Sequence, residues 1–190
     1  MDTTQQAGPR RSRIHPKMFV LLIAMASIIM MFAGLTSAYI VRKAQGNWVY
    51  YKLPGIFWIS TITILLSSFT MAVSVRSFKK RIMPRYRLML AATLLLGIVF
   101  GVCQVIGFNQ LYANNIRLNG NPSESFLFII TGLHLAHIAG GIIALLVMFF
   151  LAFRTRVKVY NTVGTEIMAW YWHFVDVLWI YLFVFFLANQ

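Results

Sequence analysis

The sequence predicts an all-α integral membrane protein with five transmembrane helices, its N-terminus inside and its C-terminus outside. Of its 190 residues, 59% are hydrophobic and only 11% are charged, unlike the composition of a soluble domain. The apolar residues form five runs, each long enough to cross the ~30 Å hydrocarbon core of a bilayer as a helix. All 17 lysines and arginines lie between or before these runs, as expected for segments at a membrane surface.

The five predicted spans differ in their polar content. The first is rich in small residues, which favours close helix packing, and the second is rich in serine and threonine, whose hydroxyls bond to the backbone or to a neighbouring helix. The third carries Gln104, the fourth a pair of histidines, and the fifth both a histidine and an aspartate. The spans cover residues 18–41, 55–75, 88–112, 124–153 and 167–187. Residues 1–17 are expected to form a basic cytoplasmic tail, and 18–190 a single transmembrane domain.

The basic residues predict the orientation. With the N-terminus inside, the inner segments hold 13 of them: four in the tail, six between positions 76 and 87, and three between positions 154 and 158. The outer segments hold four, and such an excess of basic residues is typical of the cytoplasmic side. The net charge of +13 is therefore attributed to membrane orientation and not to nucleic-acid binding. The lone Cys103 excludes an internal disulfide and a thiolate metal cluster.

Four polar residues near the middle of the bilayer are the candidate site. His134 and His137 lie on the fourth span, and His173 and Asp176 on the fifth. Each pair has i, i+3 spacing, so each presents one helix face to its neighbour. An ionised carboxylate in lipid costs at least about 2.5–3.5 kcal/mol, so Asp176 must face protein. We expect it to form a hydrogen-bonded cluster with one or two of the histidines.

Nearer the inner surface, Glu166 is expected to pair with Arg154 or Arg156. Three interpretations of the midplane cluster stay open: a structural staple between helices, a zinc or iron site, and a proton-relay or lipid-headgroup site. The HxxH spacing lacks the glutamate of a hydrolytic HExxH motif. No internal repeat indicates the two inverted halves of a transporter.

Several motifs resemble those of subunit III of the haem-copper respiratory oxidases, in the short, five-helix form. The run EIMAWYWHFVDVLW, from Glu166 to Trp179, closely resembles the E…WYWHFVDVVW signature of that family. TGLHLAH, from Thr131 to His137, is similar to its TGxHxxH motif. The stretch from Thr93 through Gln104 and the segment MFAGLTSAY ending at Tyr39 resemble two further family segments.

This resemblance implies a subunit without haem or copper that packs beside a catalytic subunit, which reduces oxygen to water and pumps protons. Family members hold phospholipid in a cleft between helix groups, and the short form lacks two N-terminal helices. At two positions where many members carry glutamate, this chain has Ile28 and Gly107, which cannot hold a proton. The matching residues are expected to be structural or lipid-binding: Gln104, His134, His137, Glu166, His173 and Asp176, with Arg154 and Arg156 nearby.

The hypothesis is a non-catalytic subunit of a cytochrome c oxidase in a bacterial inner membrane. Its expected partners are subunit I, subunit II, other respiratory-complex subunits and membrane lipids; haem and copper would reside in those subunits, and this chain would hold at most a phospholipid. Alternatives are a quinol oxidase subunit III, an accessory protein of nitric oxide reduction, a small proton or solute transporter, and a metal-dependent membrane enzyme.

Overall fold

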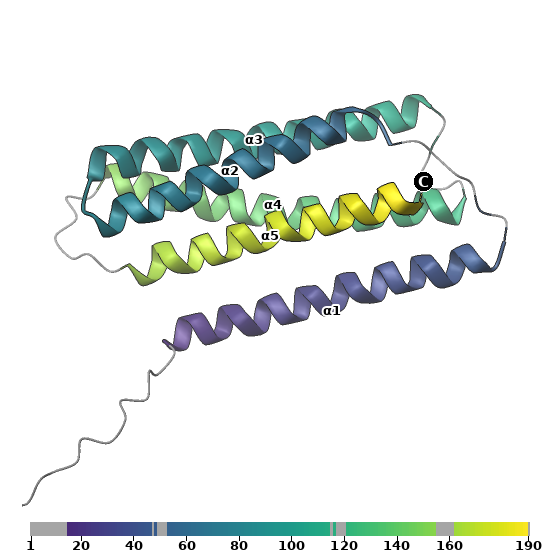
Figure 1. Ribbon diagram of the computed structural model, residues 1–190, viewed down its shortest axis with the longest axis horizontal. Helices are drawn as coiled ribbons and strands as arrows, with labels where there is room; N and C mark the ends of the chain where they lie inside the picture. Colours follow the sequence, from purple (N-terminus) through teal and green to yellow (C-terminus); the bar gives the residue numbers. More distant parts are fainter. Residues whose placement is uncertain are drawn as a thin grey trace, which may run out of the picture.

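A computed structural model of the chain describes residues 15–46, 48, 53–114, 116, 121–154 and 162–189. Within them lie five α-helices, each long and apolar enough to cross a membrane (Figure 1), which confirms the predicted all-α architecture. The helices are α1 (Pro16–Ala44), α2 (Ile56–Lys79), α3 (Met83–Ala113), α4 (Pro122–Arg154) and α5 (Val163–Asn189). The predicted tail lies outside the described residues up to position 14.

The facing ends of α2 and α3 extend beyond the predicted spans into the basic segment between them. α2 continues to Lys79 and α3 begins at Met83, so the basic segment between the two spans is mostly helical. The reason is that lysine and arginine are good helix formers, although their charges exclude them from an apolar run. Only a three-residue turn, 80–82, separates the two helices.

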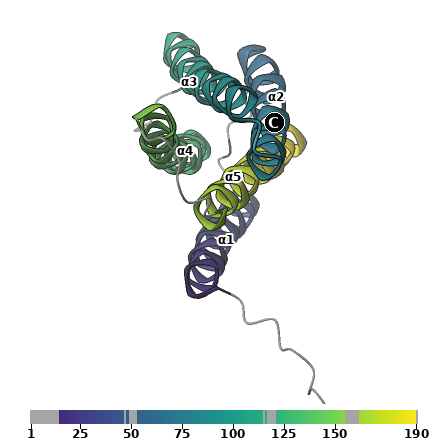
Figure 2. The same ribbon diagram turned by 90° about the vertical axis from the view of Figure 1, so that its left-hand side faces the viewer.

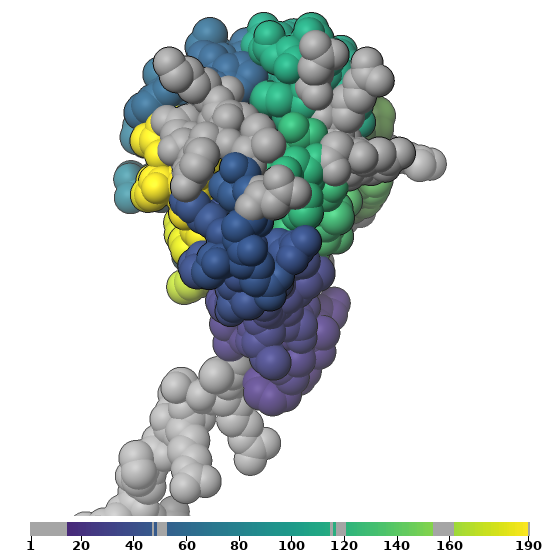
Figure 3. All heavy atoms as spheres, turned by 90° about the vertical axis from the view of Figure 1, so that its right-hand side faces the viewer, coloured from purple at the N-terminus to yellow at the C-terminus, as the bar shows by residue number. Residues whose placement is uncertain are grey.

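α2, α3, α4 and α5 form a four-helix bundle, and α1 lies beside it. Around the bundle, α2 packs on α3, α3 on α4, α4 on α5, and α5 on α2, and the α2–α3 hairpin is the most extensive of these contacts. In the described part of the chain, α1 packs only against α4 and α5. The view from the end where α1 begins (Figure 2) and the space-filling view from the opposite end (Figure 3) both show α1 standing out from the other helices.

The hydroxyls of α2 join it to α3. The Ser67 hydroxyl donates to the carbonyl of Thr93 over 3.2 Å, and the Thr70 and Thr93 hydroxyls lie 2.9 Å apart. Other α2 hydroxyls, such as that of Thr63, donate to carbonyls of their own helix. Both interactions expected of a serine- and threonine-rich span therefore occur. These hydrogen bonds join uncharged polar groups, so they are suited to a helix pair within lipid.

Trp172 of α5 fills the centre of the bundle. Its side chain is fully buried, and its Nε1–H donates to the Ser67 hydroxyl of α2 over 3.1 Å. On the other side of the ring, a Cβ atom added at Gly97 of α3 or at Gly141 of α4 would lie 2.9 Å from it. The indole thus contacts all three other helices of the bundle, and two of them approach it closely only because they carry glycine.

α1 is held at one end. Its buried residues are Phe32, Thr36 and Tyr39, all in its second half. The Thr36 hydroxyl lies 3.0 Å from the Tyr181 hydroxyl of α5, and Tyr39 packs edge-on against several aromatic rings, including that of Phe126. In the first half of α1, no described side chain is fully buried.

Candidate functional site

The predicted site residues occupy three helices at different depths of burial. His134 of α4 and Gln104 of α3 are completely buried, and Asp176 of α5 is 2% exposed. His137 and His173 are half-buried. The side chain of Glu166, near the start of α5, is 37% exposed.

His134 lies in an aromatic cage. Its ring stacks on Trp179 with centroids 5.2 Å apart and an angle of 29° between the planes. The rings of Phe100 and Phe32 meet it edge-on at 6.1 and 6.4 Å. Neither imidazole nitrogen has a hydrogen-bonding partner in the described part of the chain. The cage therefore positions His134 by ring packing.

Trp179 supports this cage from α5. Its Nε1–H donates to the Thr61 hydroxyl of α2 over 3.0 Å, and its ring meets Phe100 edge-on. Trp172 and Trp179 are two helical turns apart on α5, and both donate to hydroxyls of α2. These tryptophans and the glycines facing Trp172 were missed as site-forming residues. The sequence does contain a pattern that indicates them. The two tryptophans are seven residues apart, which places them on one face of the helix, and the adjacent spans carry glycines.

The expected hydrogen bond between Asp176 and a histidine does not form, so that prediction is wrong for this chain. Among the described residues, neither carboxyl oxygen of Asp176 has a hydrogen-bonding partner, although the Ser68 side chain lies nearby. The histidines are engaged elsewhere. His173 Nδ1 lies 2.6 Å from the Ser68 hydroxyl of α2, and His137 Nδ1 lies 2.7 Å from the carbonyl oxygen of Leu133.

Helical spacing explains the error. Two residues at i, i+3 share a helix face, but their rotamers need not converge on one partner. His173 is turned toward α2, whereas His134 is enclosed by aromatic rings. Gln104 is only partly paired. Its Nε2 donates to the Ser60 hydroxyl over 3.2 Å, while its Oε1 has no partner among the residues that the structure describes.

The candidate metal ligands do not converge. His134, His137, His173 and Asp176 all lie in the part of the chain that the structure describes. Within that part, no group of three or more histidine, cysteine, aspartate or glutamate side chains is placed to hold a metal ion. A zinc or iron site needs three or four ligands around one point, so this geometry does not support one.

Glu166 forms an ion pair with a residue that the sequence had assigned to a loop. Its Oε1 lies 2.9 Å from Nζ of Lys79, on the last turn of α2. The predicted partners cannot be compared with it, because the Arg154 side chain and all of Arg156 lie outside the described residues. That pairing stays a prediction. The unexpected contact follows from the extension of α2 through the basic segment.

The two positions without the glutamate common in the resembling family lie in apolar surroundings. Ile28 is half-buried and packs against the hydrophobic core. At Gly107, a Cβ atom would lie 2.9 Å from the Phe57 ring and 3.2 Å from Ile56. Phe57 thus occupies the space beside the α3 backbone, and a carboxylate side chain at position 107 would require its ring to shift.

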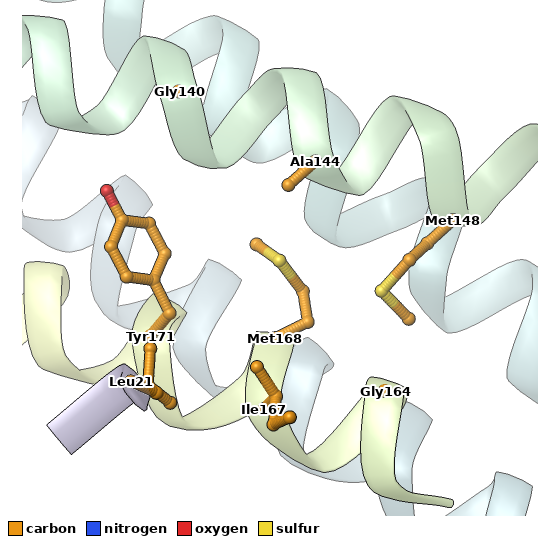
Figure 4. A pocket seen from close by; sticks show the side chains of 8 residues that line it. All are labelled: Leu21, Gly140, Ala144, Met148, Gly164, Ile167, Met168 and Tyr171. Carbon is orange, nitrogen blue, oxygen red and sulfur yellow. The ribbon is translucent and has the colours of Figure 1, made fainter. Parts of the chain in front are cut away.

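An apolar cavity of about 530 Å³ lies between the first half of α1 and helices α4 and α5 (Figure 4). The Tyr171 hydroxyl at its edge donates to the carbonyl of His137 over 2.9 Å. The other lining side chains are apolar, so the cavity is suited to hydrocarbon. It is lined by Leu21, Gly140, Ala144, Met148, Gly164, Ile167, Met168 and Tyr171.

Comparison with known proteins places this arrangement in a family. Residues 52–188 match the family model for cytochrome c oxidase subunit III. A probable cytochrome c oxidase subunit 3 of Mycobacterium leprae is 31% identical over 189 residues, with 90% of each chain covered. The corresponding protein of Mycobacterium tuberculosis strain H37Rv is 29% identical over 191 residues, again with 90% of each covered. The cytochrome c oxidase subunit 3 of Bacillus sp. PS3 is 25% identical over 158 residues, covering 80% of this chain and 76% of that one. The chain belongs to the cytochrome c oxidase subunit III family.

Proposed function

We propose that this chain is the non-catalytic subunit III of a proton-pumping haem-copper oxidase and stabilises the subunit that reduces oxygen. The observation that carries the proposal is the family match over residues 52–188, nearly all of α2 to α5. The site geometry supports it as well. The buried histidines and Asp176 are dispersed among aromatic rings and hydroxyls, as expected of side chains that position helices.

The haem and copper of the proposed complex would reside in the partner subunits. Subunit I would contact this chain directly, with subunit II as a further neighbour. The relatives compared above come from bacteria, which supports a location in a bacterial inner membrane. The five apolar helices support a multi-pass protein there.

The proposed orientation has the α2–α3 turn at the cytoplasmic face and the end of α5 outside. Six basic residues lie between Arg76 and Arg87, whereas Arg42 and Lys43 are the basic residues described at the opposite end. This asymmetry supports an inward-facing α2–α3 turn. A cysteine introduced at Asn189 should react with a membrane-impermeant maleimide in intact cells, and one at Lys80 should not. The reverse labelling would contradict the orientation.

The cavity between α1, α4 and α5 is proposed to hold a hydrocarbon chain of a bound phospholipid. Its lining is apolar, and the fully buried residues of α1 all lie in its second half. A lipid chain would fill the space beside the first half of α1, which would be surrounded by lipid in the membrane. This occupant would help to keep α1 in place next to the bundle.

The oxidase assignment is tested by purifying the full chain with its partners in a mild detergent. We expect a large multi-span partner and the absorption bands of haem, and the haem type and any bound cytochrome would identify the electron donor. Mass spectrometry of the same sample gives the subunit composition. A colourless, self-associated protein would contradict the proposal.

Substitution of Asp176 tests whether the buried polar groups act in assembly or in turnover. We expect Asp176→Ala to weaken assembly, because it leaves a void at a side chain buried in the bundle, which costs roughly 1–3 kcal/mol. Turnover per assembled oxidase should change little. Asp176→Asn keeps the volume and is the matched control, which should retain assembly.

The measurements for these variants are subunit stoichiometry in the purified oxidase and oxygen consumption per haem. A normal stoichiometry with a large loss of turnover in both variants would instead indicate a proton relay through Asp176.

A further inference from the structure

A second pocket, separate from the midplane residues, lies at the α2–α3 turn. It measures about 230 Å³ and combines cationic with apolar side chains. Three cations line it: Arg76 from the last turn of α2, Lys80 from the turn, and Arg85 from the first turn of α3. Val73, Ser77 and Ile82 complete the lining. The α2–α3 turn that carries this basic pocket is at the left-hand end of the molecule in Figure 1.

The three cations have no acidic partner among the described residues. The described acids are Glu124, Glu166 and Asp176. Glu124 lies at the opposite end of the molecule, in the first turn of α4, and Asp176 is buried in the bundle. Glu166 is at the same end as the pocket, but its carboxylate is paired with Lys79. The positive charge of the pocket is therefore uncompensated within the described part of the chain.

The turn that carries these cations has a defined and costly conformation. The N–H of Ile82 donates to the carbonyl of Ser77 over 3.0 Å, and the N–H of Arg81 donates to Phe78 over 2.9 Å. This is the Schellman pattern that ends many helices, in which the left-handed residue is usually glycine. Here that residue is Arg81, with a φ of 60°. The turn therefore keeps a basic residue where glycine would fit without strain.

The first turn of α3 adds to the attraction for an anion. α3 begins at Met83, directly after the lining residue Ile82. The positive end of its helix dipole and the first backbone N–H groups favour a negative group at that point. The three side-chain cations are the main contribution, and the helix end reinforces them.

We propose that the basic pocket binds the phosphate-bearing headgroup of an anionic phospholipid. Arginine forks match phosphate oxygens in geometry as well as in charge. Basic pockets between transmembrane helices at the cytoplasmic side are suited to such headgroups. Val73 and Ile82 provide apolar contact for the lipid next to its headgroup, which a free phosphate ion would not use. The proposal does not depend on the oxidase assignment.

The test compares lipid retention by two charge-matched variants of the full chain. Lys80→Gln with Arg85→Gln removes two positive charges from the pocket. Lys17→Gln with Arg42→Gln removes two charges elsewhere, near the two ends of α1. All four side chains are exposed, so neither pair disturbs the core, and equal thermal midpoints would verify this. Each protein is placed in nanodiscs of equal parts phosphatidylcholine and phosphatidylglycerol, and native mass spectrometry identifies the lipids it retains.

The unchanged protein and the control pair should retain phosphatidylglycerol in preference to phosphatidylcholine. The pocket pair should lose about thirtyfold of that preference, the order expected when two cations near a membrane surface are removed. An unchanged preference in the pocket pair, or an equal loss in both pairs, would overturn the proposal. A parallel sample in phosphatidylcholine alone receives inorganic phosphate. In a contrary outcome, the unchanged protein binds phosphate that the pocket pair does not bind, while no protein prefers phosphatidylglycerol. That result would show that the pocket binds a soluble anion and would overturn the proposal of a lipid headgroup.

Discussion

The structure depends on the close packing of one indole ring against two glycine-bearing helices. Trp172 is buried between Gly97 of α3 and Gly141 of α4, and neither position has room for even a methyl group without a shift. The ring's N–H is satisfied by Ser67 of α2. A single side chain from α5 thereby fixes the distances among four helices. In a membrane, where lipid is as apolar as the helices, such close packing is what holds a bundle together.

The other polar and aromatic residues follow from this central contact. On the same helix as Trp172, His173 meets Ser68 of α2, and Trp179, two turns further on, stacks against His134. The buried polar groups are thus placed by ring packing and by hydroxyls. α1 contributes Phe32 to the ring packing around His134, and its first half borders the apolar cavity.

The sequence was sufficient for the number and type of the helices, because hydropathy over some twenty residues is a strong signal. It also identified Asp176, His134 and Gln104 as polar groups within the spans, and the structure buries all three. It did not predict their partners. Spacing along a helix tells which residues share a face, whereas a hydrogen bond depends on the rotation of each helix and the rotamer of each side chain. The Glu166–Lys79 pair was missed for another reason, since a basic helical turn looks like a loop when only hydropathy is considered.

The central claim is that Trp172 and Gly97 are packed too closely for any larger residue, and a double-mutant cycle tests it most directly. The thermal midpoint of the full chain in mild detergent would be measured for Gly97→Ala, Trp172→Phe and the pair, with Gly101→Ala as control because a Cβ there meets no atom within 4 Å. Gly97→Ala should cost about 1–3 kcal/mol by overpacking, and Gly101→Ala should cost nothing. The pair should lose less than the sum of the single changes, because phenylalanine leaves room for the added methyl group. A harmless Gly97→Ala, or strictly additive losses, would contradict the account.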